Sequence, residues 1–153
     1  MSACELHRDQ EISIYCADTN RMVYGPIHKL YERFQNKLIG VVYAGKIYSA
    51  KIIRIPVWKE FYNVNNILRC TGNLSVLVDG KKKRVSDLKV GDSIDVNTIN
   101  YSHLYIESWT YPTTIVQKCE IIGCFNDFTY GFEFIDTPNR RVILTNGIII
   151  EID

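Results

Sequence analysis

Cysteine and histidine side chains are the residues of this chain with the widest chemical range, because both types can act as nucleophiles, proton carriers or metal ligands. The set comprises Cys4, Cys16, Cys70, Cys119, Cys124, His7, His28 and His103. The cysteines form an odd set with irregular spacing, and no Cys-x-x-Cys or paired Cys/His spacing suited to tetrahedral zinc occurs. We therefore expect free thiols, no metal site and at most one cysteine with a chemical role. We also expect Cys119 and Cys124 to be buried and His28 to be a solvated surface side chain.

Several common catalytic and binding signatures are absent from the sequence. It contains no Gly-rich phosphate loop, no His-Glu-x-x-His, no Gly-x-Ser-x-Gly and no EF-hand loop. The net charge is +1, from 18 Lys+Arg and 17 Asp+Glu, so no excess of cations is available to release phosphate counterions. We therefore expect no nucleic-acid partner, and we interpret the basic block Lys81-Lys82-Lys83-Arg84 as the solvated tip of a hairpin.

Short β-strands are the elements that must position any reactive residue here. Strand-forming residues, several with period two, predict strands at Glu11–Tyr15, Leu38–Tyr43, Lys46–Ile55, Ile67–Arg69, Ser75–Val78, Ser93–Val96, Tyr105–Ser108, Thr113–Ile122, Gly131–Ile135, Arg141–Leu144 and Ile148–Ile152. Turn signals separate many of them, at Ala44-Gly45, Asp79-Gly80, Val90-Gly91-Asp92, Asn126-Asp127 and Asn146-Gly147. A helix is predicted at Pro26–Phe34, where apolar residues recur at helical spacing behind a proline, and a second short one at Val85–Leu88.

About eleven strands and one or two helices predict an all-β fold with a barrel-like or folded-ribbon architecture rather than a parallel α/β sheet. The 153 residues are enough for one domain spanning residues 1–153, which should bury roughly 70% of the surface of the unfolded chain. The first ten residues hold acids and no apolar core of a signal peptide, and no uncharged apolar run approaches the ~18 residues that cross a bilayer. We therefore expect a soluble, cytoplasmic monomer without a membrane partner.

Two runs in the middle of the chain resemble the second splicing block of inteins. They are Cys70-Thr71-Gly72-Asn73-Leu74-Ser75-Val76-Leu77-Val78-Asp79-Gly80 and Val85-Ser86-Asp87-Leu88-Lys89-Val90-Gly91-Asp92-Ser93-Ile94. In that family a Thr-x-x-His precedes a strand, a turn with glycine and a hairpin with the pattern dLkvGD. The order and spacing of this chain agree, although Leu74 stands where the family has histidine.

The two ends of the chain extend this resemblance over nearly its whole length. Cys4, the strand Glu11–Tyr15 and the run Gly25–Arg33 are similar to the intein opening, and the run Tyr130–Ile150 resembles the closing blocks. The resemblance implies the Hint (hedgehog/intein) fold, a flat horseshoe of β-strands related by a pseudo-two-fold. The region Asn97–Tyr111, where larger inteins carry a homing endonuclease, is short here, which implies a mini-intein.

The resemblance also implies a self-processing chemistry that starts at Cys4. Its thiol would attack the carbonyl of Ala3 in an N-to-S acyl shift, with Met1-Ser2-Ala3 as a remnant of the upstream extein. Thr71, with Asn73 beside it, would help to hold the scissile amide, although Thr71 could also be an ordinary strand residue. The step would be slow without the family histidine, unless His7 or His103 takes its place as general acid. No cofactor is implied, and the partners implied are the flanking extein polypeptides in cis.

The closing blocks depart further from the family pattern. Arg140 replaces a histidine, and the acidic residue that follows the block's tyrosine appears here as Glu133, one or two places later. The final His-Asn falls on Glu151-Ile152 or on Ile152-Asp153, and Asp153 offers a carboxylate where the family's cyclisation step uses an amide nitrogen. Three readings fit these departures. The chain is an intein with altered assisting residues and at least N-terminal cleavage through Cys4, or a splicing-inactive Hint module that serves in binding or structure, or an inactivated domain that leaves its precursor intact.

Overall fold

The computed structural model describes residues 4–100 and 107–152, without the side chains of residues 57–58, 97–100, 107–113 and 123–127. Its strands are β1 (Cys4–Leu6), β2 (Glu11–Cys16), β3 (Arg21–Pro26), β4 (Ile39–Tyr43), β5 (Lys46–Val64), β6 (Leu68–Thr71), β7 (Ser75–Val78), β8 (Lys81–Arg84), β9 (Ser93–Asn100), β10 (Glu107–Ile115), β11 (Cys119–Phe134), β12 (Arg141–Ile143) and β13 (Ile149–Glu151). The helix α1 covers Ile27–Arg33, and a 3-10 turn covers Val85–Asp87. The expectation of an all-β fold with one or two short helices is confirmed.

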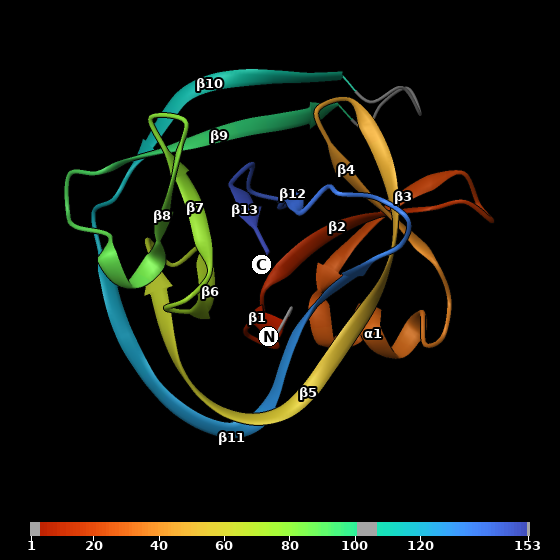
Figure 1. Ribbon diagram of the computed structural model, residues 1–153, viewed down its shortest axis with the longest axis horizontal. Helices are drawn as coiled ribbons and strands as arrows, with labels where there is room; N and C mark the ends of the chain where they lie inside the picture. Colours follow the sequence, from red (N-terminus) through yellow and green to blue (C-terminus); the bar gives the residue numbers. More distant parts are fainter. Residues whose placement is uncertain (1–3, 101–106, 153) are drawn as a thin grey trace.

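Two antiparallel sheets build the molecule. The larger has the strand order β11-β1-β6-β5-β4-β2-β3, and the smaller has the order β10-β9-β7-β13-β12 with β8 beside β7. The long strands β5 and β11 run side by side as a curved ribbon along one rim of the molecule (Figure 1). The sheets curl around this ribbon, which gives the horseshoe shape expected from the family resemblance.

The strand β1 occupies a closed circuit of hydrogen-bonded neighbours. It pairs with β11 on one side and with β6 on the other, β6 pairs with β5, and β5 pairs again with β11. In the view of Figure 1, β1 and β13 both lie inside the ring formed by the other strands. A three-residue strand at the start of the chain is thus held by two neighbours rather than left to fray.

One large hydrophobic cluster joins the two sheets. Its fully buried members include Leu6 of β1, Phe132 of β11, Val76 of β7 and Ile150 of β13, each at most 1% exposed. Because this cluster includes side chains from both the first and the last described strands, folding of the core fixes the positions of β1 and β13 relative to each other. The same cluster contains Leu74, which is 1% exposed.

The local elements follow the turn chemistry of the sequence in most places. The residue pairs Ala44-Gly45 and Asp79-Gly80 adopt positive φ values of 51° and 75°, and of 52° and 76°. This is the combination that two-residue hairpins require. Pro26 stands before the first helical residue of α1, where a missing amide hydrogen costs nothing. The helix has seven residues, and no helix in the described part of the chain is long and apolar enough to cross a membrane.

Three local predictions, of a strand, a turn and a hairpin tip, are corrected by the structure. The run Thr113–Ile122 is not one strand, because residues 116–118 separate β10 from β11 and turn the chain between the sheets. The pair Asn126-Asp127 is not a turn, since both residues pair with β5 in the middle of β11. The basic block is the edge strand β8 rather than only a hairpin tip.

Candidate functional site

The thiol of Cys4 is fixed inside the closed circuit of strands. Cys4 pairs with Gly131 of β11, and Leu6 pairs with Tyr130, so β1 has one residue more than β11 between these two pairs. The extra residue is Glu5, which forms a bulge, and bulges of this kind redirect side chains at the edges of sites. Cys4 is 1% exposed. The reactive atom predicted from the sequence is therefore buried and held in a defined place.

A connected set of polar side chains surrounds the backbone of Cys4. The Nζ of Lys59 donates a hydrogen bond to the carbonyl oxygen of Cys4 at 3.0 Å and lies 3.5 Å from Oε1 of Glu5. The hydroxyl of Thr71 donates to the other carboxylate oxygen of Glu5. The Lys59 and Glu5 side chains are only 20% and 11% exposed, and Thr71 is buried. The contacts thus run from β6 through β1 to β5, and we call Lys59, Glu5 and Thr71 the polar cluster.

The electrostatic surroundings of the Cys4 thiol oppose its ionisation. Burial raises the pKa of Cys4 to about 11, the positive charge of Lys59 acts to lower it, and the negative charge of Glu5 raises it further. Burial also raises the pKa of Cys70 on the neighbouring strand β6. Near neutral pH the Cys4 side chain is therefore a thiol, and a reaction through its thiolate must first remove a proton.

The segment from Thr71 to Leu74 forms a tight turn between β6 and β7. The amide of Leu74 donates to the carbonyl of Thr71 at 3.4 Å, which closes a four-residue turn. Thr71 lies in the polar cluster, whereas Asn73 is exposed. A pocket of about 280 Å³ opens at this turn. Its lining consists of Lys59, Glu60, Tyr62, Thr71, Gly72, Asn73 and Ser86. The structure thus brings Thr71 to the surroundings of Cys4 and leaves Asn73 at the rim of the pocket.

The glycine in this turn is required by close packing. A Cβ at Gly72 would lie 2.7 Å from Cε1 of Tyr62 and 2.9 Å from Cβ of Ser86. We expect Gly72→Ala to lower the free energy of unfolding by about 1–3 kcal/mol, as overpacking commonly does. Urea denaturation measures this loss, and the neighbouring exposed substitution Asn73→Ala should stay within about 0.5 kcal/mol of the wild type. Equal stability of Gly72→Ala and wild type would contradict this account of the turn.

The arrangement of these strands matches solved intein structures over almost the entire chain. A DnaB intein from Synechocystis sp. PCC 6803 aligns with a TM-score of 0.65 over 97% of this chain and 98% of its own, at 16% identity. The Mvu transcription factor IIB mini-intein gives 0.64 over 97% and 99% at 17% identity, and the VidaL intein gives 0.70 over 99% and 98% at 16% identity. This chain has the Hint fold of an intein. No protein-family model and no curated protein matches its sequence.

The alignment with the mini-intein covers nearly all of both chains, so the Hint fold here carries no inserted endonuclease domain. Two positions of the chain lack the groups that the intein blocks carry. Leu74, at the position of the block histidine, is buried in the hydrophobic core. The residue after Tyr130 is Gly131, directly opposite Cys4, and the acidic Glu133 is an exposed residue further along β11. The Hint fold is therefore kept here without these two proton-carrying side chains.

The C-terminal strand carries a carboxylate that is held by two cations. Glu151 of β13 accepts a hydrogen bond from Nε of Arg141 at 2.9 Å and contacts Nζ of Lys82 at 2.7 Å. Arg141 also donates to the hydroxyl of Tyr43 at 2.8 Å. Burial raises the pKa of Glu151, but the hydrogen bonds from Lys82 and Arg141 outweigh it, so that the pKa is lowered. Glu151, one of the positions where the family's final histidine would fall, is thus an anchor for β13 and stays ionised.

We expect Glu151→Gln to lower the free energy of unfolding at neutral pH by about 1–3 kcal/mol, the usual size for hydrogen bonds to charged groups. Because the folded-state pKa is lowered, the contribution of Glu151 is present above its ordinary pKa and is lost as the pH falls through the folded value. Urea denaturation between pH 3 and pH 7 should therefore show that the free energies of unfolding of the wild type and Glu151→Gln differ at pH 7 and become equal in acid. Glu133→Gln, an exposed carboxylate on β11, serves as the control, and equal stabilities at pH 7 would contradict the anchoring role.

Arg140 lies in the loop between β11 and β12, at a position where the closing blocks of inteins carry a histidine. Its guanidinium is exposed and donates to the carbonyls of Thr137 and Asn139, both at 2.8 Å. The carbonyl of Arg140 accepts the amide of Ile152 at 2.8 Å, which holds the last described residue beside the loop that precedes β12. Asp153, the residue expected to carry a C-terminal step, lies outside the described residues, as do Met1-Ser2-Ala3 and His103.

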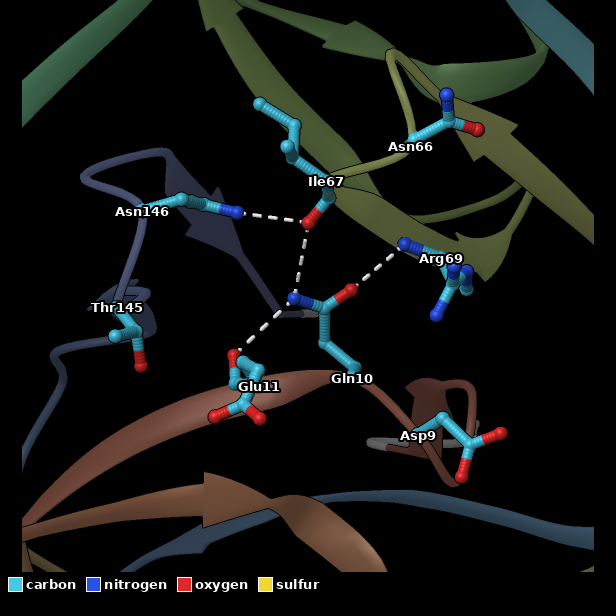
Figure 2. Close-up of a pocket in the computed structure, with 8 residues that line it drawn as sticks. All are labelled: Asp9, Gln10, Glu11, Asn66, Ile67, Arg69, Thr145 and Asn146. Carbon is cyan, nitrogen blue, oxygen red and sulfur yellow. Dashed lines mark hydrogen bonds between the residues drawn. The ribbon is translucent and has the colours of Figure 1, made fainter.

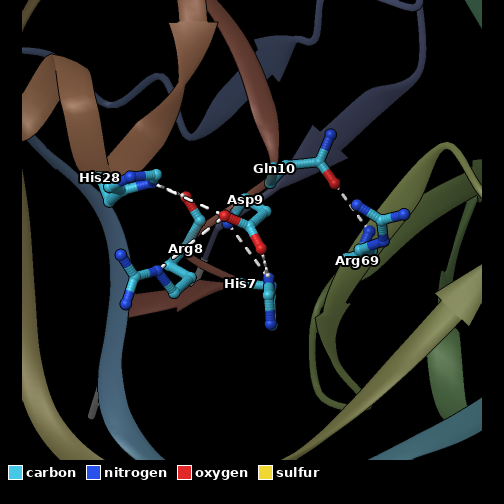
Figure 3. Close-up of polar contacts among 6 residues, drawn as sticks. All are labelled: His7, Arg8, Asp9, Gln10, His28 and Arg69. Carbon is cyan, nitrogen blue, oxygen red and sulfur yellow. Dashed lines mark hydrogen bonds and ion pairs between the residues drawn. The ribbon is translucent and has the colours of Figure 1, made fainter.

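Two of the histidines meet at the turn that follows β1 (Figure 3). Nδ1 of His7 accepts the backbone amide of Asp9 at 3.1 Å, and its ring packs edge-on against Phe61 at 5.0 Å. Phe61 pairs with Thr71 across β5 and β6, so His7 lies close to the polar cluster. His28, expected on the solvated surface, is instead only 16% exposed, with Nδ1 2.8 Å from the carbonyl of Arg8. Among the described residues, no group of three or more His, Cys, Asp or Glu side chains could hold a metal ion.

A second pocket, of about 260 Å³, marks where the C-terminal hairpin meets the N-terminal half of the chain (Figure 2). The side-chain amide of Asn146 donates to the carbonyl of Ile67 at 2.7 Å, and the amide of Gln10 donates to the same carbonyl at 3.2 Å. Gln10 also accepts the backbone amide of Arg69 at 2.7 Å. These bonds fix the turn between β12 and β13 to the start of β6, and so set the position of the C-terminal strand relative to β1.

Sequence reasoning found Cys4 and Thr71 but missed Glu5 and Lys59. The two missed residues are separated by more than 50 positions and belong to no motif of the sequence. No sequence signal pointed to Lys59, which lies beyond the strand predicted at Lys46–Ile55. Cys119 is half-buried and contacts the carbonyl of Val85 at 3.6 Å, and the side chain of Cys124 is outside those that the structure describes.

Proposed function

We propose that this chain is an intein-type self-processing domain that acts through an N-to-S acyl shift at Cys4. The observation that carries the proposal is the position of Cys4, buried in β1 with the polar cluster against its backbone. A thiol in a Hint fold at the start of the first strand, with a threonine hydroxyl and a cation nearby, has the surroundings that acyl transfer needs.

The reaction exchanges one bond for another within the chain. The Cys4 sulfur attacks the carbonyl carbon of Ala3, the bond between that carbon and the Cys4 nitrogen breaks, and the upstream polypeptide becomes a thioester on sulfur. The thiol proton is transferred, directly or through another group, to the nitrogen, which leaves as an amine. An added thiol can then take the acyl group from Cys4 and release the upstream polypeptide. No cofactor is required.

The first step is expected to be slow. The thiol is un-ionised near neutral pH because burial raises the pKa of Cys4 to about 11, and Leu74 cannot protonate the departing nitrogen. A well-placed general acid contributes about 10²–10⁴-fold to such a step. His7, beside Phe61, is the histidine nearest to the polar cluster in the described part of the chain, and we propose it as the substitute acid.

A splicing-inactive Hint module is the second candidate. Its support is two departures from the family pattern: Leu74 is packed into the core, and Gly131, opposite Cys4, offers no side chain. In that case the flanking polypeptides remain attached and the fold serves as a binding or structural domain. For the self-processing candidate, the partners are those same flanking polypeptides, acting as substrates in cis.

The test is the mass of a fusion with stable reporter domains at both ends, followed over hours with and without dithiothreitol. Self-processing predicts that the N-terminal reporter is released, and that thiol accelerates its release. A product in which the two reporters are joined would extend the activity to full splicing. An unchanged mass under all conditions would refute the self-processing proposal and favour the inactive module.

A further inference from the structure

Lys59 is a cation in direct contact with the backbone of Cys4, and its position is unusual for a lysine. It lies on β5, and its ammonium group reaches across to donate to the carbonyl of Cys4 at 3.0 Å. Its side chain is only 20% exposed, although lysine side chains are rarely buried without a partner. The partner is Glu5, whose Oε1 lies 3.5 Å from Nζ.

Glu5 links this lysine to the threonine of the splicing block. One carboxylate oxygen of Glu5 faces Lys59, and the other accepts the hydroxyl hydrogen of Thr71. Because Glu5 is the bulged residue of β1, its direction is set by the backbone shift between the Cys4 and Leu6 pairs. The lysine and the threonine are therefore joined through one shared carboxylate, that of the residue next to Cys4.

The charged and titratable groups around Cys4 come from each neighbouring element. The strand β5 supplies Lys59, β1 supplies Glu5, the turn after β1 supplies His7, and β6 supplies Cys70, whereas β11 presents Gly131. Among these groups, Lys59 is the one that acts to lower the pKa of the Cys4 thiol, while burial and Glu5 raise it. The pKa of the Cys4 thiol therefore depends on how close the ammonium group of Lys59 is held to it.

We propose that Lys59 is the positioning residue of the acyl shift: its ammonium group fixes the carbonyl of Cys4 and supplies the positive charge beside the attacking sulfur. This inference rests on the proposed function. Lys59 keeps its proton throughout, since the thiol hydrogen moves to the Cys4 nitrogen and no bond to Lys59 forms or breaks. It offers a fixed charge in a site from which the usual histidine and the acidic residue after Tyr130 are absent.

The test compares Lys59→Met with Lys59→Arg and Glu5→Gln in the reporter fusion, over a series of pH values. Because the charge of Lys59 acts to lower the pKa of the Cys4 thiol, Lys59→Met should slow thiol-dependent cleavage near pH 7.5, by about tenfold for each unit by which that pKa rises. Its rate profile should move to higher pH, whereas that of Glu5→Gln should move to lower pH. Lys59→Arg should keep the wild-type profile, and Lys46→Met, an exposed lysine on the same strand, is the matched control.

A second readout does not depend on cleavage. In the same variants, the Cys4 thiol is titrated through its ¹³Cβ chemical shift, with Cys4→Ser used to assign the signal. The midpoint of the Cys4 titration should move to higher pH in Lys59→Met and to lower pH in Glu5→Gln, relative to the wild type. A residue with only a structural role would change the amount of folded protein and leave the midpoint of the folded form in place.

The outcomes separate the two proposals. Cleavage by the wild type with coincident rate profiles and midpoints in Lys59→Met would overturn the role of Lys59 and leave the proposed function standing. An inert wild type with shifted midpoints would overturn the proposed function and keep the charge effect of Lys59 on the thiol. Coincident midpoints in an inert protein would overturn both. Profiles and midpoints that shift in opposite directions in Lys59→Met and Glu5→Gln support the assignment.

Discussion

Replacing Cys4 with alanine is expected to abolish thiol-dependent release of an N-terminal reporter. The acyl shift needs a nucleophile on this residue, and no other thiol is attached to the amide that would break. Loss of the buried sulfur should cost only about 1–2 kcal/mol of folding free energy, because one small group is removed from a position that is 1% exposed. Intact mass over time measures cleavage, and circular dichroism shows that the variant is folded.

Two further cysteine variants sharpen this prediction. Cys4→Ser keeps a weaker oxygen nucleophile, so it should release the reporter more slowly than the wild type. Cys16→Ala should leave the reaction unchanged. Cys16 is the informative control because hydrogen bonds from Thr19 lower its pKa, yet it lies at the end of the β2–β3 hairpin, in which Cys16 pairs with Arg21. Cleavage that persists in Cys4→Ala, or is lost in Cys16→Ala, would place the chemistry elsewhere.

The strand content could be predicted because most strands follow β-branched and aromatic residues with recognisable turns between them. The strands β2, β4 and β7 begin and end within about one residue of the expected positions. Two of the unexpected strands have other patterns: β8 is composed of three lysines and an arginine, and β3 contains a Gly-Pro pair. Both are sheet edges, where charges and prolines are tolerated because one side of the strand needs no partner.

The length of β5 and β11 could not be predicted from local signals. A Gly-Cys pair and Asn126-Asp127 interrupt the strand-forming residues of β11, yet the strand continues from Cys119 to Phe134 because each part is paired with β5. The two strands stabilise each other over a distance that no local window covers. Tertiary pairing overrides residue preference at such positions.

The site was predictable only where the family resemblance supplied a role. Cys4 and Thr71 were found by motif, and the structure places both beside Glu5. The contact between Lys59 and Cys4 depends on the bend of β5 and on the bulge in β1, and neither leaves a sequence signature. The sequence therefore pointed to Cys4 and missed the charged side chains that lie beside it.

At residue 74, packing of the core favours an apolar side chain, whereas the chemistry of the splicing block calls for a histidine. The side chain of Leu74 is 1% exposed and packs in the cluster that joins the two sheets, while its amide closes the turn on Thr71. A leucine at this position stabilises the core. A histidine would instead place a proton donor in the same turn as Thr71, which belongs to the polar cluster. The two requirements cannot be met by one side chain.

Replacing Leu74 with histidine is therefore expected to raise the rate of thiol-dependent cleavage by about 10²–10⁴-fold, the usual contribution of a positioned general acid. The same change should lower the free energy of unfolding by about 1–3 kcal/mol, because a polar ring replaces a buried apolar side chain. The rate should also acquire an acid-side dependence, since the histidine must be protonated while the thiol must lose its proton. Cleavage rates between pH 5 and pH 9 measure this profile.

Leu74→Gln is the matched control, because it introduces a polar side chain of similar length that cannot transfer a proton. It should lose comparable stability and gain no rate, which separates proton donation from loosening of the core. If Leu74→His and Leu74→Gln cleave equally fast, residue 74 does not reach the departing nitrogen in this chain, and the slow step has another origin. A gain confined to the histidine variant would show that the fold here keeps the geometry of acyl transfer and that a proton donor at residue 74 limits its rate.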